Sequence, residues 1–318
     1  MSIESAKPTD RASRWAGRSR WASVQEVVVS LFLGFCAVVT ILTTIGIIAV
    51  LGIESARFFA RPEVSVVDFF FGTKIDPSGT PPRFGLLPLV WGTFVIAFGS
   101  SLIALPIGLL SAIYLSEYAP KRVRGFLKPA LELLAGVPSI VYGYLALLLV
   151  TPALQWLLSP LGFEVDGFNA LSACVVVGIM VIPLVSSLSE DVLTAVPRGL
   201  REAAYGLGAT KFEVSTRIVL PAALSGVVAS FLLAISRAVG ETMAVVLAAG
   251  SRPGISLNVL RSVETMTAYI VAVVGGEETE GSTKSLSLFA VGLALFGITL
   301  LMNLAANAVL RRYREVYQ

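Results

Sequence analysis

Histidine is absent from this 318-residue sequence, and cysteine occurs only twice. Without histidine, Ser-His-Asp and Cys-His catalysis, a histidine-ligated zinc site and a histidine pH switch are all excluded. The two cysteines, Cys36 and Cys174, lie in apolar runs and match no disulfide framework or metal-site spacing. We interpret them as small buried hydrophobic residues.

Charge is the next thing that the sequence has little of. Only 14% of the residues are charged and 55% are apolar, with a mean hydropathy of +0.82. A soluble domain carries about 25% charged residues. The shortfall excludes a soluble or disordered chain and predicts an all-α integral membrane protein, because a helix satisfies its own backbone groups in lipid.

Six apolar stretches are long enough to cross the membrane. A span needs roughly 20 helical residues. The expected spans are residues 27–53, 86–115, 130–158, 170–188, 222–249 and 286–310, with tails at 1–26 and 311–318. Prolines in the second and third spans, including Pro106 and Pro138, predict kinks or breaks.

The distribution of basic residues orients these spans. Sixteen Lys and Arg residues fall in the two tails and the loops 116–129 and 189–221, against seven in the opposite loops. Since basic residues accumulate on the cytoplasmic side, both termini are predicted to be cytoplasmic. The outer loops, 54–85 and 250–285, are either a docking surface for an external partner or plain connectors; the second contains Glu277, Glu278 and Glu280.

The sequence has no nucleotide-binding motif. Residues 206–211 have neither the spacing of a phosphate-binding loop nor a preceding strand. Any ATP that drives this chain would therefore bind to another subunit. No basic stripe with interleaved aromatic residues indicates a nucleic acid, and no lysine base lies in a span to support an intramembrane protease. We expect a subunit that is not an enzyme and holds no metal or cofactor.

The loop 189–221 carries the most specific motif. It reads Glu202-Ala203-Ala204, three residues, Gly208, nine residues, Ile218, one residue, Leu220-Pro221. This spacing resembles the EAA loop of ABC importer permeases, the MetI-like type I superfamily, at every fixed position. The residues from 201 to 205 are expected to form a short helix that ends at the following glycines. The resemblance implies that Glu202, Ala203, Ala204 and Gly208 couple the permease to a cytoplasmic ATPase.

Three further stretches narrow the resemblance. Residues 111–119 (SAIYLSEYA), 134–143 (LAGVPSIVYG) and 236–245 (SRAVGETMAV) are similar to phosphate ABC permeases, and residues 70–73 and 243–245 favour the PstC type. The likeness covers roughly residues 65–310 and departs from the family at residues 74–82. It implies a bacterial inner-membrane importer with a PstA-like second permease, two PstB-like ATPases that bind ATP and Mg²⁺, and a PstS-like periplasmic phosphate-binding protein.

One basic residue lies inside a predicted span. Arg237 costs roughly 2.5–3.5 kcal/mol there unless it is compensated. Glu241 is four residues later, one helical turn away on the same face, and Ser230 is seven residues earlier on that stripe. Two interpretations are open, a structural ion pair and an anion site. A guanidinium suits phosphate because its planar fork donates two parallel hydrogen bonds. In the second interpretation Glu241 weakens anion binding and accepts the hydrogen bond of the P–OH group.

Ser139 and Tyr142 follow the proline of the third span and are further candidates for the substrate pathway. Packing between helices is the alternative explanation for both. Two other functions remain possible for the whole chain. One is an ABC permease for another solute, such as molybdate, sulfate or an amino acid. The other is a transporter driven by an ion gradient, which would be expected to contain several intramembrane acids.

Overall fold

We describe a computed structural model covering residues 20–276, 279 and 281–312. The tails at 1–19 and 313–318 and the residues Glu277, Glu278 and Glu280 lie outside the described part. The chain divides into two units, Met1–Ile53 and Glu54–Gln318. The first helix, α1 (Arg20–Phe59), begins in the first unit and ends in the second. Three of its threonines bond within the helix: Thr40, Thr43 and Thr44 each donate to the carbonyl four residues earlier.

The centre of the second unit is a pair of long helices, α3 (Leu87–Ile113) and α7 (Ala170–Ala195). Glycines bring them together: a Cβ on Gly99 would lie 2.4 Å from Cys174 Sγ, and one on Gly108 would lie 2.7 Å from Val185 Cβ. Such close contact is typical of helices that pack in lipid through small residues. Both helices continue through an internal proline, and α3 passes into the π-helical turn η2 (Tyr114–Tyr118).

The third predicted span differs from the structure at its start. Residues 121–135 form a separate amphipathic helix, α4 (Lys121–Ala135), and the chain breaks at 136–138. A shorter span follows as α5 (Ser139–Leu145), η3 (Ala146–Val150), α6 (Thr151–Leu158) and η4 (Ser159–Leu161). The expectation of one span over 130–158 is therefore corrected, since the sequence from 130 to 135 belongs to α4. The predicted break at Pro138 is confirmed.

The fifth predicted span, 222–249, is not one helix either. After α8 (Arg198–Gly206) come α9 (Lys211–Glu213), η5 (Val214–Val219) and α10 (Leu220–Ala222). The chain then bends by 72° into α11 (Leu224–Val239). A second break at residues 240–242 separates α11 from α12 (Met243–Ala249), which packs against α5 and α7.

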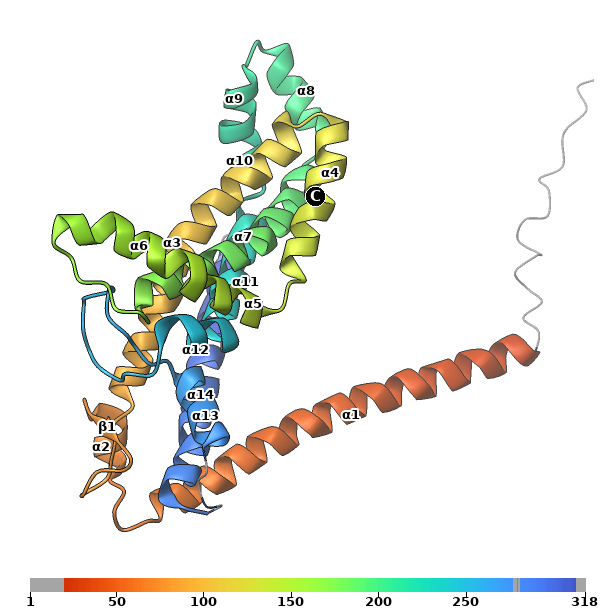
Figure 1. The fold of residues 1–318 in the computed structure, drawn as a ribbon. Helices are drawn as coiled ribbons and strands as arrows, with labels where there is room; N and C mark the ends of the chain where they lie inside the picture. The colour runs from red at the N-terminus through yellow and green to blue at the C-terminus, as the bar shows by residue number, and fades with distance from the viewer. Residues whose placement is uncertain (1–19, 277–278, 280, 313–318) are drawn as a thin grey trace, which may run out of the picture. The chain divides into compact units, whose positions relative to one another are not determined.

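The outer part of the second unit contains α2 (Val66–Phe71), a two-stranded hairpin of β1 (Ile75–Asp76) and β2 (Arg83–Phe84), and α13 (Met266–Gly275). The hairpin includes most of residues 74–82, where the sequence was expected to depart from the phosphate ABC permeases that it resembles. Buried aromatic rings hold this region together: Phe58 makes edge-to-face contacts with Phe69 and Phe84 at 5.6 and 5.2 Å. The last helix is α14 (Thr283–Arg312). Figure 1 shows α13 and α14 side by side.

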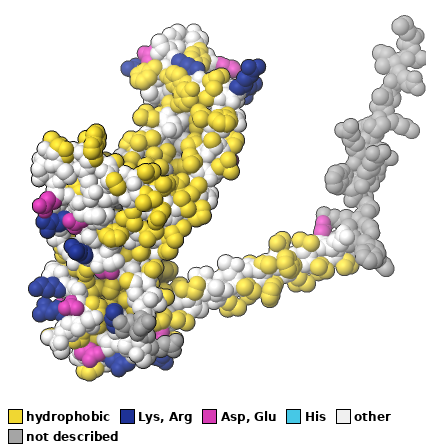
Figure 2. Space-filling view, in the orientation of Figure 1, with side chains coloured by type: hydrophobic (Ala, Val, Ile, Leu, Met, Phe, Trp, Pro, Cys, Tyr) yellow, Lys and Arg dark blue, Asp and Glu magenta, His cyan; other side chains and the backbone are white. Residues whose placement is uncertain are grey.

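Within the described residues, five helical segments are long and apolar enough to cross a membrane, or six if the bent pair around residue 223 is one span. The predicted all-α bundle is confirmed. In Figure 2, hydrophobic side chains cover the middle of the second unit, and charged side chains gather at the α8–α9 end and at the opposite end. Such a band between two charged zones is what a lipid bilayer requires.

Candidate coupling and transport site

The helix predicted from the EAA motif is present as α8. Ala204 turns into the protein with 8% of its surface exposed, whereas Glu202 and Ala203 are exposed. The helix ends in a turn at Gly208, whose φ of +83° is left-handed and favours glycine. The motif therefore builds a short, exposed helix with an acidic residue on its outer face.

The chain after this turn begins a new helix with a capping box. The Thr210 hydroxyl accepts a hydrogen bond from Glu213 N at 3.3 Å, and the Glu213 carboxylate accepts one from Thr210 N at 2.9 Å. This reciprocal pair satisfies backbone donors that a helix start leaves free. The turn is thus fixed by Gly208 on one side and by the capping box of Thr210 and Glu213 on the other. A pocket of about 340 Å³ lies beside it.

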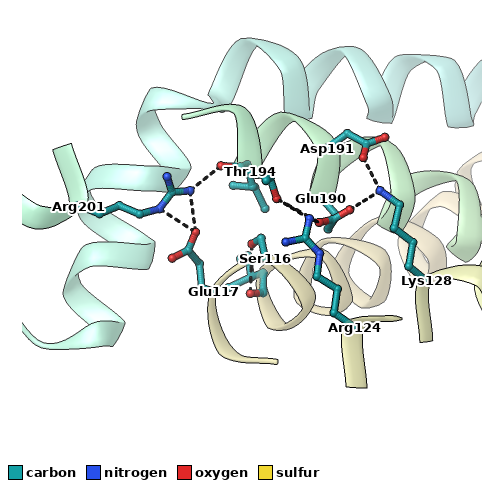
Figure 3. Close-up of polar contacts among 10 residues, drawn as sticks. Ser116, Glu117, Arg124, Lys128, Glu190, Asp191, Thr194 and Arg201 are labelled. Atoms are coloured by element: carbon teal, nitrogen blue, oxygen red, sulfur yellow. Dashed lines mark hydrogen bonds and ion pairs between the residues drawn. The ribbon is translucent and has the colours of Figure 1, made fainter. Parts of the chain in front are cut away.

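Arg201, directly before Glu202, fastens α8 to the rest of the protein. Its guanidinium donates to the Glu117 carboxylate of η2 at 2.9 Å and to the Leu193 carbonyl of α7 at 2.7 Å, with a further bond to the Val196 carbonyl (Figure 3). In the sequence Arg201 counted toward topology and began the expected short helix, with no partner assigned to it. Its role was missed because Glu117 lies 84 residues away.

A second ion-pair cluster lies on the same stretch of α7. Glu190 is completely buried, and its carboxylate pairs with Arg124 and with Lys128, both from α4 (Figure 3). Thr194 donates to the same carboxylate at 3.0 Å, and Lys128 also pairs with the exposed Asp191. The sequence reasoning missed Glu190, because an acid near the predicted end of a span looks like an ordinary boundary residue.

The two clusters meet in a pocket of about 360 Å³ between η2, α4, α7 and α8. It is lined by Ser116, Glu117, Arg124, Thr194, Arg198, Arg201, Glu202 and Tyr205. The exposed helix α8 therefore lies on a network of charged groups from three other elements.

The proposed anion residues lie on either side of a helix break. Arg237 is in the last turn of α11 and is exposed, and Glu241 follows the end of the helix at Val239. The prediction that both share one helical face is wrong, because residues 240–242 are not helical. Among the described residues Arg237 has no ion-pair partner. Glu241 instead accepts a hydrogen bond from Ala244 N at 3.3 Å, at the start of α12.

Other elements converge on this break. Thr267 of α13 donates to the Glu241 backbone carbonyl at 2.9 Å. Gly143 of α5 packs against α12 so tightly that a Cβ there would lie 3.0 Å from Ala244 Cα. Ser230, which the sequence placed on the same stripe as Arg237, bonds instead to Ser189 of α7 at 2.7 Å. The break is therefore positioned by α5, whose Ser139 and Tyr142 the sequence had assigned to the same pathway, and by α13, which the sequence had not connected to it.

The remaining pathway candidates have separate places. Tyr142 is buried, and its hydroxyl donates to the Leu134 carbonyl of α4 at 2.9 Å. Ser139 is half-buried in the first turn of α5, and the described residues include no hydrogen-bond partner for it. Tyr142 thus joins the two helices across the break at Pro138.

A known protein family matches a large part of this chain. Residues 104–315 match the model of the binding-protein-dependent transport system inner membrane component family. The chain is 34% identical to the phosphate transport system permease protein PstC of Mesorhizobium japonicum, over 98% of this chain and 97% of the relative. It is 30% identical to the probable ABC transporter permease protein YqgH of Bacillus subtilis, over 88% and 89%.

A solved structure shows the same fold. The bacterial ABC transporter that imports the acidic polysaccharide alginate contains a chain that superposes with a TM-score of 0.62. The match covers 93% of this chain and 99% of that one, at 15% sequence identity. At this identity the likeness concerns the fold.

Proposed function

The chain belongs to the binding-protein-dependent transport system inner membrane components, and we propose that it is the membrane-spanning subunit of an ATP-driven importer of inorganic phosphate. The observation that carries this proposal is the EAA helix α8, exposed at Glu202 and anchored through Arg201. The PstC relatives, which are similar over most of the chain, support phosphate as the substrate.

The chain is a permease subunit without chemistry of its own. A cytoplasmic ATPase, which binds ATP and Mg²⁺, contacts α8. When the two ATPase subunits close on each other, they move this helix. The bundle then rocks between inward-open and outward-open states, as alternating access requires. A second, PstA-like permease completes the pore, and a PstS-like binding protein delivers phosphate from outside. Both termini are on the cytoplasmic side of the bacterial inner membrane.

Arg237 is the residue that we assign to the anion. A free guanidinium in an apolar segment is costly unless it meets a partner. Its position in the last turn of α11, exposed and without an ion pair among the described residues, leaves its donors available to a tetrahedral oxyanion. Glu241, beyond the break, faces the protonated oxygen of phosphate in this proposal. Sulfate lacks that proton, so an ionised carboxylate beside it only repels.

Uptake of labelled phosphate into proteoliposomes tests the function. The complex of this chain with its ATPase, second permease and binding protein is expected to accumulate phosphate only with ATP, and sulfate poorly. Accumulation by this chain alone, driven by an ion gradient, contradicts the proposal. A complex that accumulates sulfate or molybdate in preference to phosphate retains the ABC mechanism and refutes the substrate.

A further inference from the structure

The ion-pair cluster around Glu190 connects two helices that the sequence keeps apart. The Glu190 side chain is 0% exposed, and both of its cationic partners, Arg124 and Lys128, come from α4. A protein is strongly destabilised when a buried carboxylate loses its cations, whereas the loss of an ion pair on the surface costs little stability. The contact therefore holds α4 against α7 in one arrangement.

The same two turns of α7 also hold the coupling helix. Arg201 of α8 bonds to the Leu193 carbonyl of α7, three residues after Glu190, and to Glu117 of η2. Thr194 belongs to the Glu190 cluster through bonds to the carboxylate at 3.0 Å and to Arg124 at 3.1 Å. In Figure 3 the two clusters lie next to each other on α7. A force on α8 thus reaches α4 through direct polar contacts.

From α4 the contacts continue to the helix break at Glu241. Tyr142 of α5 bonds to the Leu134 carbonyl of α4 across the break at 136–138. Gly143, the next residue, packs against Ala244 of α12. Ala244 N in turn donates to the Glu241 carboxylate. The contacts form a series from Arg201, the neighbour of Glu202, to Glu241 that passes through Glu190.

The chain itself provides a second route from α8, through η5 and α10 into α11. This route reaches the break from the other side, since α11 ends at Val239 and α12 begins at Met243. A movement of α8 therefore acts on α11 along the chain and on α12 through α4. The residues between them, 240–242, are where the two movements separate.

We propose that Glu190 is a positioning residue for transport: by locking α4 to α7, it makes α4 move with the coupling helix and carry that movement to α12 at the Glu241 break. This inference rests on the proposed function. It predicts that Glu190 is needed to convert ATP hydrolysis into movement of the solute, and that it touches neither ATP nor the anion.

The first test compares uptake with ATP hydrolysis in the reconstituted complex. The variant Glu190→Gln keeps the size of the side chain and removes its charge. We expect phosphate uptake per ATP to fall by about tenfold while hydrolysis is retained. Asp191→Asn is the matched control, because Asp191 is 58% exposed and pairs only with Lys128 among the described residues. It is expected to leave uptake per ATP unchanged.

Two further variants keep the test decisive if Glu190→Gln does not assemble. Lys128→Gln leaves Arg124 on the Glu190 carboxylate and is expected to lower uptake per ATP by a smaller factor. The exchange of Glu190→Lys with Lys128→Glu restores an ion pair between the two helices and is expected to recover part of the uptake. Full uptake per ATP in Glu190→Gln, or in Lys128→Gln where Glu190→Gln does not assemble, overturns the proposal.

The second test measures the two helices directly and does not depend on the solute. Spin labels are placed at Gly125→Cys on α4 and Gly199→Cys on α8, where no atom crowds either position. Cys36 is exposed and is replaced by serine, whereas Cys174 is buried. We expect one narrow distance with and without ATP, and a broadened distribution in Glu190→Gln. If the distance between the two labels changes on ATP binding in the complex that keeps Glu190, the rigid connection between α4 and α8 is refuted.

The outcomes separate this inference from the function that it rests on. A complex that does not transport phosphate but keeps a fixed distance between α4 and α8 refutes the proposed substrate and leaves the rigid connection standing. A complex that transports phosphate with ATP and tolerates Glu190→Gln without loss of uptake per ATP refutes the role of Glu190 alone.

Discussion

The hydroxyl of Tyr142 donates a hydrogen bond to the backbone carbonyl of Leu134 at 2.9 Å, across the chain break between α4 and α5. The bond lies at the end of α4, where the same carbonyl also accepts a hydrogen bond from Val137 N at 3.2 Å. It also fixes the direction in which α5 leaves α4. Because α5 packs on α12, this single contact bears on the position of Glu241.

Tyr142→Phe removes that bond and leaves the ring in place. We expect a loss of stability of about 1 kcal/mol, the usual contribution of one hydrogen bond, and reduced phosphate uptake because α5 is less firmly oriented. Thermal unfolding of the purified complex measures the first effect. Tyr144→Phe is the control, since Tyr144 is 58% exposed. Equal melting temperatures for the two variants would contradict this role for the hydroxyl.

Gly143→Ala introduces a methyl group into the contact between α5 and α12. The new Cβ would lie 2.9 Å from Leu247 Cβ and 3.1 Å from the Ala244 carbonyl oxygen. Overpacking of this kind costs about 1–3 kcal/mol. We expect a lower melting temperature and lower uptake. Gly136→Ala, where the nearest atom is 3.4 Å away, is expected to be tolerated. If Gly143→Ala lowers neither the melting temperature nor the uptake, α5 and α12 are free to separate.

Gly208→Ala tests the turn after the coupling helix. No atom crowds the position, but its φ of +83° is unfavourable for a side chain with a Cβ. The expected cost is about 1 kcal/mol, seen as weaker binding of the ATPase in a pull-down of the complex. Gly199→Ala, in the helical part of α8, has the same free space without the positive φ and is expected to bind normally. The prediction fails if both variants bind alike.

Arg237→Gln removes the cation that we assign to phosphate. We expect uptake of labelled phosphate to be lost while membrane insertion and assembly remain normal, because the described residues include no ion pair that the substitution breaks. Arg237→Lys keeps the charge but not the two parallel donors, so partial uptake is expected. Normal uptake by Arg237→Gln removes the residue from the mechanism. Loss of assembly instead indicates a structural role.

Glu241 is tested by comparing two substitutions. If its carboxylate discriminates phosphate from sulfate, Glu241→Gln, which offers a neutral amide in the same place, is expected to improve sulfate passage more than Glu241→Ala. The readout is labelled sulfate uptake by the assembled complex. Equal sulfate uptake by the two variants would leave Glu241 as a helix cap for α12 only.

Glu264, in the outer segment before α13, predicts a pH dependence of stability. It is 6% exposed, and burial raises its pKa from 4.5 to about 7. The folded state thus holds the proton more tightly than the unfolded state. Stability is complete below about pH 4.5 and falls as the pH rises through about 7. Glu264→Gln is expected to melt above the unsubstituted protein at pH 8 and close to it at pH 5.

The control for this prediction is Glu164→Gln, an exposed acid on the outer side. Its melting curve is expected to follow that of the unsubstituted protein at both pH values. A Glu264→Gln variant whose melting temperature shows the same dependence on pH as the unsubstituted protein would assign that dependence to another group.

The sequence predicted the elements whose signals are local. Apolar runs of span length gave the helical membrane bundle, because the cost of unsatisfied backbone groups in lipid leaves a helix as the simplest solution. The spacing from Glu202 to Pro221 gave the helix α8 and its glycine turn, since a left-handed residue favours glycine wherever it occurs. Pro138 gave the break before α5, because a proline interrupts a helix at its own position in the chain.

What failed was the inference from a stretch of sequence to one straight helix. Residues 222–249 form one mainly apolar stretch that contains Arg237 and Glu241, yet the helix stops at Val239 and restarts at Met243. No proline marks this break. It is held by Thr267 and by Ala244, so contacts from distant segments decide it.

The sequence by itself determined that this chain is a membrane helix bundle with a short helix and glycine turn at the EAA motif, because hydropathy and turn chemistry act over a few neighbouring residues. Only the tertiary structure decided that Glu190 joins α4 to α7, that Arg201 joins α8 to Glu117, and that Arg237 and Glu241 stand on opposite sides of a break. An ion pair depends on distance in space, and residues 62 to 84 positions apart are brought together only by the packed fold.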